Sequence, residues 1–361
     1  MAHEIRESDS FGEVRVHGKR AWHGLGIEID EGTAVEGFKR IGLGWETELV
    51  PIHYEVQVPV ADATTVEVSK RQFKLLKKKI TEKRAHVRLD TGAFLGIVGE
   101  DFKVMENQRL AEFADALVEG SGPKGERATL ETAGSLYGGR RIFACVKLPK
   151  EIGLGKGGAD VQEMYMLIGN GHGGFASFSI YPTAVRVVCA NTLRYSEKDL
   201  ASGISFRHTG DWDAKLAAAK VAVGMAIVEA EEFEKQAKAL VRTNLSEKKF
   251  EEYLVRTYLD LFHGGKEPDV IDMDAEEVEK LRVKREKILG QWTEKFHNEK
   301  QSLPGIRDSA WAAFNAVSEW EDHGRGRFKT VSESDSRIHS NVYGVSSREK
   351  RTAFKNALSL V

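Results

Sequence analysis

The chain has few cysteines and no long hydrophobic run, and each shortage excludes a class of protein. Its 361 residues include two cysteines, Cys145 and Cys189, too few for a disulfide scaffold or a four-cysteine zinc site. The longest nearly apolar run, 221–228, spans about eight residues, whereas a membrane helix needs roughly 20. The first ten residues lack the basic and apolar parts of a signal peptide. We therefore expect a reduced, cytoplasmic protein with no membrane partner.

Net charge is also nearly absent. The 53 basic and 55 acidic residues leave a formal charge of −2, so attraction to nucleic acid has to come from a local patch. The length allows about two or three domains. A hydrophobic content of 41% supplies a substantial core, which excludes global disorder.

Two composition regimes divide the chain. Most glycines and short β-like runs precede residue 205, whereas the stretch from 211 to 300 is rich in Ala, Glu, Lys and Leu. We therefore predict a boundary within 202–210. The expected regions are an α+β core domain and candidate nucleic-acid-binding domain (1–205), a helical domain (211–323), and a Gly/Ser/Arg-rich loop with a short terminal helix (324–361).

Short elements come in adjacent pairs in the first region. Helices are expected over 31–42 and 107–119. Strands are expected at 45–60, 85–89, 94–98, 164–168, 176–181 and 185–189, with a further hairpin over 128–146. Because the strands do not alternate with long helices, the predicted fold class is α+β. It comprises an N-terminal mixed or antiparallel sheet with short helices, followed by a mainly α-helical C-terminal region.

The second region is expected to be helical. Asp211 is predicted to cap a helix over 212–242, and Ser246 to begin the next one. The run 269–287 places acids before bases, an order that suits the macrodipole of an exposed helix. An amphipathic helix is expected over 310–320 and a terminal helix over 348–360.

The strongest local charge anomaly is the segment 70–88. It carries nine bases against one acid, Glu82, a net charge of +8 in 19 residues. Basic side chains spaced along a segment neutralise successive phosphates and release counterions, so the run predicts nucleic-acid or other polyanion binding. A solvated lysine-rich linker would have the same composition. The bases are Lys70, Arg71, Lys74, Lys77, Lys78, Lys79, Lys83, Arg84 and Arg88.

Arginines, aromatic rings and glycines supply further candidates for the same interface. Guanidinium groups at turns and strand ends make bidentate phosphate contacts, and rings stack on bases. The glycine-rich stretch 169–174 would let backbone amides approach a phosphate. The sequence holds neither a Walker loop nor a Rossmann fingerprint, and we expect no cofactor and no metal. The arginines are Arg140, Arg141, Arg186 and Arg194, for which four unrelated surface residues are the alternative interpretation, and the rings are Trp22, Trp45 and Phe73.

Two weaker constellations would suit an enzyme. His172 and Cys189, 17 residues apart, pair a base with a thiol but lack an orienting third group; a buried structural cysteine is the simpler interpretation. Glu319, Asp322 and His323 share a helix face at a spacing that can hold a divalent cation. Either His23 or His172 would complete such a site. A polar helix end that meets solvent or nearby arginines is the favoured interpretation of the group.

Several segments resemble the phage/plasmid-like proteins of the domain of unknown function 932. They follow the family's order over nearly the whole chain and are AWHGLG (21–26), LDTGAFLGIVGEDFKVMENQ (89–108), LETAGSLYGGRRIFACVKLP (130–149), AVRVVCANTL (184–193) and AWAAFNAVSEWEDH (310–323). Where the family often has an Asn-Ser-His-Asp-Gly type of segment, this chain has Asn-Gly-His-Gly-Gly at 170–174. That difference weakens any mechanism with an Asp beside His172. The resemblance implies a bacterial phage or plasmid origin and brings no established reaction.

The order of the first elements is similar to another group of proteins. A helix ending at Gly44-Trp45, a strand, a basic connection, a hairpin with Asp-Thr-Gly and a helix resemble the β-β-β-α core of single-strand annealing recombinases of the Red-beta and Erf kind, a similarity of pattern alone. It implies a homo-oligomer that binds single-stranded DNA and promotes annealing or recombination non-covalently. A metal-dependent nuclease or nucleotide-modifying enzyme is the alternative, and an anti-defence or structural phage protein is a third.

Overall fold

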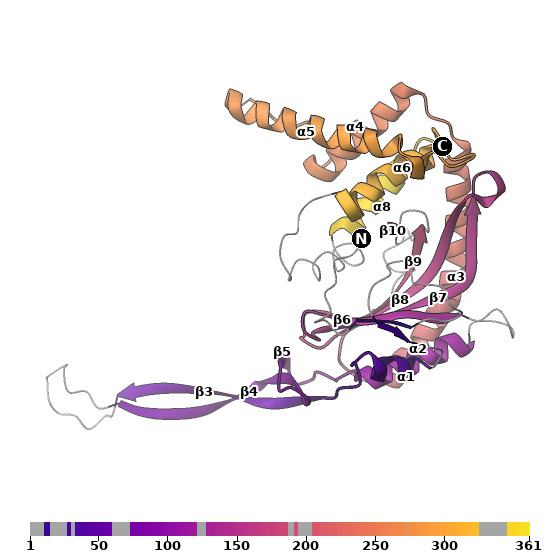
Figure 1. The fold of residues 1–361 in the computed structure, drawn as a ribbon. Coiled ribbons are helices and arrows are strands. Elements are labelled where there is room, and N and C mark those ends of the chain that lie inside the picture. The colour runs from indigo at the N-terminus through magenta and orange to yellow at the C-terminus, as the bar shows by residue number, and fades with distance from the viewer. Residues whose placement is uncertain are drawn as a thin grey trace.

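The fold is α+β, as predicted. The computed structural model describes residues 11–14, 27–29, 33–59, 73–120, 128–186, 191–193, 204–271, 273–324 and 345–361. Within these ranges, two β-sheets with short helices are followed by a mainly helical C-terminal region (Figure 1).

The larger sheet, sheet A, has the strand order β10-β9-β8-β7-β6-β1-β2, with β11 also pairing with β9. Only β1 and β2 pair in parallel; the other neighbours are antiparallel. The hairpin expected over 128–146 is confirmed as β6–β7. The strands are β1 (Phe11–Val14), β2 (Ile27–Ile29), β6 (Thr129–Leu136), β7 (Arg141–Leu154), β8 (Asp160–Gly171), β9 (Phe178–Arg186), β10 (Asn191–Leu193) and β11 (Ile204–Phe206).

One strand prediction in sheet A is wrong. The two strands expected at 176–181 and 185–189 are a single strand, β9, which continues through Pro182. On the edge away from β8, β11 pairs with 178–180 and β10 with 184–186. Pro182 lies between these two partners, so its missing N–H costs no ladder bond on that edge.

The smaller sheet, sheet B, consists of β3 (Thr47–Pro59), β4 (Phe73–Arg88) and β5 (Phe94–Gly99), all antiparallel. We call β3 and β4 the arm. Because β5 pairs only with 83–87, the distal half of the arm is two-stranded, and it projects away from the rest of the molecule (Figure 1). At the boundary, Ile52 pairs with Ile80 and Pro51 with Arg84, which leaves a bulge on β4.

The basic connection expected between two strands is therefore wrong. From residue 73 onward the basic run is itself strand β4. Apolar residues before and after its three consecutive lysines meet apolar partners across the ribbon: Leu76 pairs with Val56, and Ile80 with Ile52. Such cross-strand pairs stabilise a ribbon whose lysines disfavour strand structure.

Helices pack on one face of sheet A and build the C-terminal region (Figure 1). The caps predicted at Asp211 and Ser246 are confirmed, because their side chains accept hydrogen bonds from the N–H groups of Asp213 at 2.9 Å and Lys249 at 3.4 Å. None of the helices described is both long and apolar enough to cross a membrane. The helices are α1 (Ala34–Arg40), α2 (Asn107–Gly120), α3 (Trp212–Arg242), α4 (Glu247–His263), α5 (Ala275–Phe296), α6 (Ala310–Glu319) and α8 (Val345–Leu358), with short turns η2 (Lys156–Gly158), η3 (Glu299–Gln301) and the π-helical η4 (Trp320–Gly324).

The buried core continues from the sheet into the helices. One apolar cluster includes Ile142 of β7, Phe233 of α3 and Trp311 of α6. Trp311 also donates its Nε1–H to Asp160 at 2.8 Å, which links α6 to the start of β8. The division into three regions stays a prediction, because a shared core does not locate a boundary.

Helix α6 is buried on all sides, so the amphipathic helix expected here is wrong. Every residue from Ala310 to Glu319 is buried, and Trp311, Phe314 and Val317 anchor the helix in the core. Just beyond the helix, Asp322 forms an ion pair of 2.6 Å with Lys350 of α8, and both side chains are 1% exposed. Two charges buried together depend on each other, because removing one leaves the other uncompensated.

We predict that Lys350→Met lowers the free energy of unfolding by about 3–5 kcal/mol, because Asp322 would stay buried without its cation. Lys280→Met is the matched control: its pair with Glu276 is 70% and 77% exposed and contributes less than about 1 kcal/mol. Urea denaturation followed by tryptophan fluorescence measures both. Equal effects of the two substitutions would contradict the prediction.

Candidate nucleic-acid interface

Strand geometry determines on which face of the arm each basic side chain of β4 lies. Successive side chains point to opposite faces of a strand, and the register pairs Lys77 with Glu55 and Lys78 with Tyr54. Lys77 and Lys79 therefore share one face of the arm, whereas Lys78 lies on the other. The arm presents cations on both of its faces.

These lysines are exposed and have no carboxylate partner. Lys77, Lys78, Lys79 and Lys83 are all exposed, and none forms an ion pair with another residue of the described ranges, although Lys77 lies directly across from Glu55. The two strands together contain seven bases and three acids, a net charge of +4. Their positive charge is therefore available to an external polyanion.

The arm also exposes apolar surface between its cations. Tyr54 is 46%, Val56 38% and Leu75 58% exposed. By the register, Tyr54 and Val56 lie on the face that also carries Lys78. Tyr54 was missed by the sequence reasoning; its spacing of two from Ile52 and Val56, with polar His53 and Glu55 between them, was the signal that could have placed this ring on one face of a strand.

At its base the arm is fixed to sheet A by buried histidines. His86 of β4 donates its Nδ1–H to the carbonyl oxygen of His172 at 2.5 Å. His172 in turn donates its Nε2–H to Oδ1 of Asn107 at 2.8 Å. The Asn107 amide is oriented by its own Nδ2, which donates to the carbonyl of Leu43 at 3.0 Å. We call this contact region the joint; it consists of Leu43, Trp45, His86, Arg88, Gly96, Asn107, His172, Gly173 and His208.

Glycines of the stretch 169–174 make the joint possible. A Cβ atom at Gly96 of β5 would lie 2.4 Å from the carbonyl oxygen of Gly173, so the two backbones touch directly. Residues 171–173 are buried. Close packing therefore explains these glycines better than the expected approach of a phosphate to their amides.

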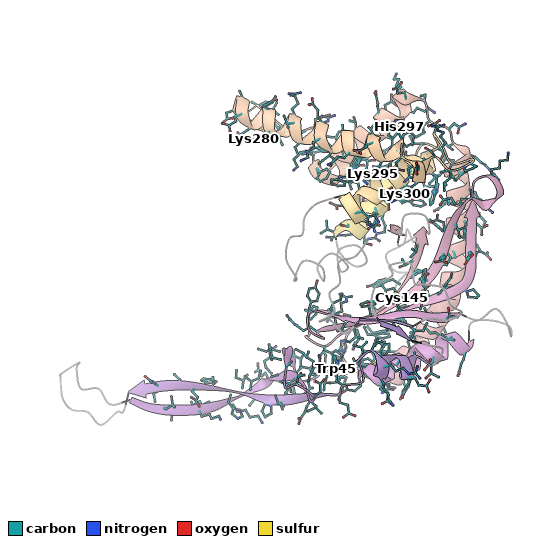
Figure 2. All side chains as sticks on the ribbon, in the orientation of Figure 1. Trp45, Cys145, Lys280, Lys295, His297 and Lys300 are labelled. Carbon is teal, nitrogen blue, oxygen red and sulfur yellow. The ribbon has the colours of Figure 1, made fainter. Side chains whose placement is uncertain are left out.

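Arg88 and Trp45 belong to the joint and not to an exposed interface. The Arg88 guanidinium donates to both carboxylate oxygens of Asp90, at 3.0 and 2.6 Å, and lies 4.3 Å from the centre of the Trp45 ring. Trp45 is 7% exposed and lies at the root of the arm (Figure 2). Base stacking on Trp45 is therefore wrong as an expectation, because its ring is buried and Arg88 covers one face.

The other arginines differ in their availability. Arg140 is exposed; its Nε donates to the carbonyl of Leu95 at 2.8 Å and its guanidinium lies 4.8 Å from the Phe175 ring. Arg84 is half-buried and donates to carbonyl oxygens of its own bulge. Arg141 is 5% exposed, so the expected phosphate contact from Arg141 is wrong.

For most of the remaining candidates the structure does not describe the side chain. For Lys74, Phe73 and Arg186 only the backbone is described, within β4 and β9. Cys145, the described cysteine, is buried in sheet A, and burial raises the pKa of its thiol. The predictions for Lys70, Arg71, Trp22, His23, Cys189 and Arg194 lie outside the described residues.

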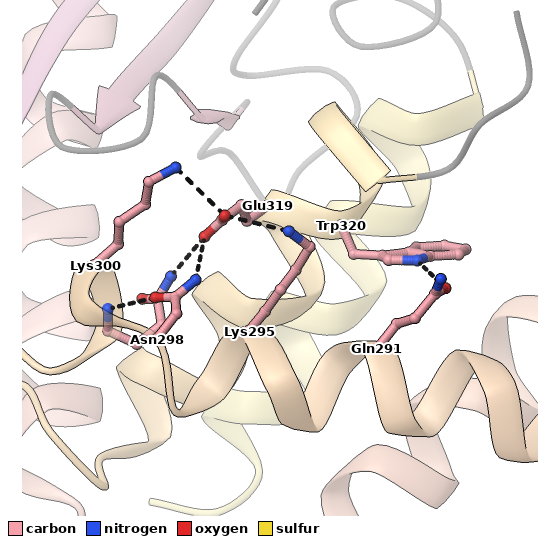
Figure 3. Close-up of polar contacts among 7 residues, drawn as sticks. Gln291, Lys295, Asn298, Lys300, Glu319 and Trp320 are labelled. Carbon is pink, nitrogen blue, oxygen red and sulfur yellow. Dashed lines mark hydrogen bonds and ion pairs between the residues drawn. The ribbon is translucent and has the colours of Figure 1, made fainter.

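The carboxylates considered as cation ligands are held by amino and amide groups. Oε1 of Glu319 accepts from Lys295 at 3.2 Å and Lys300 at 3.4 Å, and Oε2 from Asn298 at 3.3 Å and Gln301 at 3.1 Å (Figure 3). Burial raises the pKa of Glu319, but the charges of Lys295 and Lys300, together with the hydrogen bonds from Asn298 and Lys295, outweigh burial and hold the pKa below its ordinary value.

The exposed polar helix end is therefore wrong as an interpretation. Glu319 is 4% and Asp322 1% exposed, and each pairs with lysine. His172 lies at the joint, so the structure does not bring it to Glu319. Across the described ranges, no three His, Cys, Asp or Glu residues are grouped so as to hold a metal ion.

Burial keeps three histidines of the joint neutral. His208 donates its Nδ1–H to the carbonyl of Lys103 at 3.2 Å and stacks on Phe102, 4.6 Å between ring centres. Among the residues that the structure describes, the second ring nitrogens of His86, His172 and His208 find no hydrogen-bond partner. Burial lowers the pKa of all three, that of His208 to about 4; repulsion from the protonated forms of His86 and His208 and from Arg88 lowers the pKa of His172 further.

We predict that the free energy of unfolding falls as the pH drops from about 6.5 to about 4. Unfolded histidines bind protons in this window while the buried ones do not, which costs about 1.4 kcal/mol per pH unit for each histidine. His208→Phe keeps the stacked ring without a titrating group and should make the slope shallower by about one proton.

Urea denaturation at a series of pH values measures the slope. His53→Gln, at an exposed position on β3, is the control and should leave the slope as in the parent protein. An unchanged slope in His208→Phe would show that His208 is not neutral and buried as described.

Comparisons with known proteins identify a family. No curated protein and no solved structure matches the chain. The family described as Domain of unknown function (DUF932) matches residues 94–343. The match begins with β5 and includes the glycine-rich stretch and α6, whereas the arm precedes it. Because the match covers more than half of the sequence, the chain belongs to the DUF932 family.

Proposed function

We propose that this protein binds single-stranded DNA through its arm and promotes annealing or recombination without covalent chemistry. The observation that carries the proposal is the set of exposed, unpaired lysines on both faces of a projecting ribbon. At about 3.3 Å per residue, the 16 residues of β4 extend roughly 50 Å. Over that length several phosphates of a bound strand can be neutralised, with release of their counterions.

The exposed ring and aliphatic side chains favour a single strand over a duplex. A two-stranded ribbon also fits the major groove of duplex DNA, but a duplex hides the faces of its bases. A single strand offers those faces to side chains such as Tyr54, which stands beside Lys78 on the same face of the arm. The preferred ligand of the arm is therefore unpaired DNA.

Origin and assembly rest on the sequence resemblances. From the resemblance of the family segments we infer an origin in a phage, prophage or plasmid and a site of action in the cytoplasm of a bacterial host. The element order, which resembles that of annealing recombinases, supports self-association as part of the proposal, because one arm gives a contact track too short to hold two complementary strands in register.

We predict that Lys77→Glu/Lys78→Glu/Lys79→Glu weakens binding of a labelled 20-nucleotide single strand, measured by fluorescence anisotropy between 50 and 300 mM salt. Because this variant no longer neutralises three of the phosphates, the slope of log affinity against log salt should become shallower by about 2. The matched control, Lys248→Glu/Lys249→Glu/Lys287→Glu, makes the same charge change at exposed helical positions.

The control triple variant should bind almost as well as the parent protein. Equal weakening by both triple variants would mean that overall charge and not the arm governs binding. No binding by the parent protein at low salt would refute the proposal.

We further predict a homo-oligomer in the form of a ring or filament. Light scattering after size-exclusion chromatography, at micromolar protein with and without a 60-nucleotide single strand, should give a mass of several chains in at least one condition. A strict monomer in both would contradict annealing while leaving single-strand binding in place.

A further inference from the structure

A cavity of about 470 Å³ opens at the base of the arm. It lies between the β4–β5 hairpin, the loop 174–177 after β8 and the loop 207–209 after β11. This volume lies within the roughly 300–1,000 Å³ typical of small-molecule sites. None of its lining residues belongs to the lysine triplet of the distal arm.

An exposed aromatic ring forms part of the cavity wall. Phe175 is 47% and Ile97 55% exposed, and both line it. Arg140 holds Phe175 from outside the cavity, with its guanidinium 4.8 Å from the ring centre. Deeper in the wall, Phe102 stacks on His208. Such a wall suits a flat aromatic ligand.

Charged groups of both signs surround this wall. Lys83 and Arg207 are exposed at the cavity, and neither forms an ion pair with any residue the structure describes. Glu100 and Asp101 are also exposed there and equally unpaired. Cations beside an aromatic wall suit a phosphate, and carboxylates accept hydrogen bonds from the amino groups of nucleobases.

We propose that this cavity binds one nucleobase, with its ring against Phe175, its phosphate beside Lys83 and Arg207, and its exocyclic amino group donating to Glu100 or Asp101. The base belongs to the strand held by the arm, so the inference rests on the proposed function in that respect alone. Cytosine carries such an amino group and thymine does not. The cavity therefore prefers cytosine over thymine, whereas the lysines of the arm do not distinguish them.

The first experiment tests the stacking wall by anisotropy with labelled dC20 and dT20. Phe175→Ala should weaken dC20 binding by about 5- to 100-fold, and Phe175→Trp should retain it. Phe94→Ala is the matched control, because Phe94 is 59% exposed on the neighbouring strand β5 but does not line the cavity. Equal effects of the two alanine variants would overturn the proposal.

The second experiment tests the carboxylates through the ratio of the dC20 and dT20 affinities, in which a change of net charge cancels. Glu100→Ala/Asp101→Ala should reduce the preference for dC20 by at least about 5-fold, since a well-placed pair discriminates by about 1–3 kcal/mol. Glu251→Ala/Glu294→Ala, at exposed helical positions, should leave the ratio unchanged. An unchanged ratio in the first variant would refute base recognition here.

The free nucleotides dCMP and dTMP separate the cavity from the arm. Calorimetry should show dCMP binding that Phe175→Ala abolishes and that the lysine triple variant retains. If dCMP binds in this way but dC20 does not, the cavity stands and the proposed function fails. If dC20 binds through the arm with no effect of Phe175→Ala, the cavity proposal fails and the proposed function stands.

Discussion

The hydrogen bond from His86 to the carbonyl oxygen of His172 anchors the base of the arm to the segment that follows β8. Beyond the joint the ribbon has two strands and no covering layer, and such a hairpin is marginally stable by itself. Its direction therefore depends on a few contacts at its base: the buried histidine pair, the touching backbones of Gly96 and Gly173, and Arg88 between the exposed Asp90 and the buried Trp45. The cavity lies next to the joint, because β4 and β5 contribute residues to both and His208 lines the cavity. The lysines, the joint and one wall of the cavity therefore follow one another along β4 and β5.

Local signals could be read from the sequence, whereas pairing between distant segments could not. The caps at Asp211 and Ser246 depend on residues two or three positions away, and the turn at 90–92 on its own three residues. Strand β4 depends on β3, which lies across a long connection, and its lysines taken alone argue against a strand. The burial of Glu319 and Asp322 was hidden for the same reason. Their partners Lys295 and Lys350 lie on other helices.

The positive charge of the candidate interface could be predicted from the sequence, but the role of each of its side chains could not. Composition identified the basic run, and the structure divides it into exposed lysines and an arginine that holds the joint. Phe175 had no signal, since a single ring after a glycine-rich stretch has no neighbours with which to form a pattern. The family match adds a distinction: it begins at residue 94, so most of the cavity lies within it and the lysine arm lies outside. Base recognition and phosphate neutralisation are therefore supplied by different parts of the chain.

The central claim is that one DNA strand contacts both the arm and the cavity at its base. Photo-crosslinking with single strands that carry 5-iodocytosine, followed by mass spectrometry of the attached peptides, measures this contact directly. The account predicts crosslinks to two peptides, one containing Tyr54 and one containing Phe175, and their loss at high salt as the phosphate contacts weaken. Crosslinks confined to α4 and α5, or a pattern that salt does not change, would contradict it.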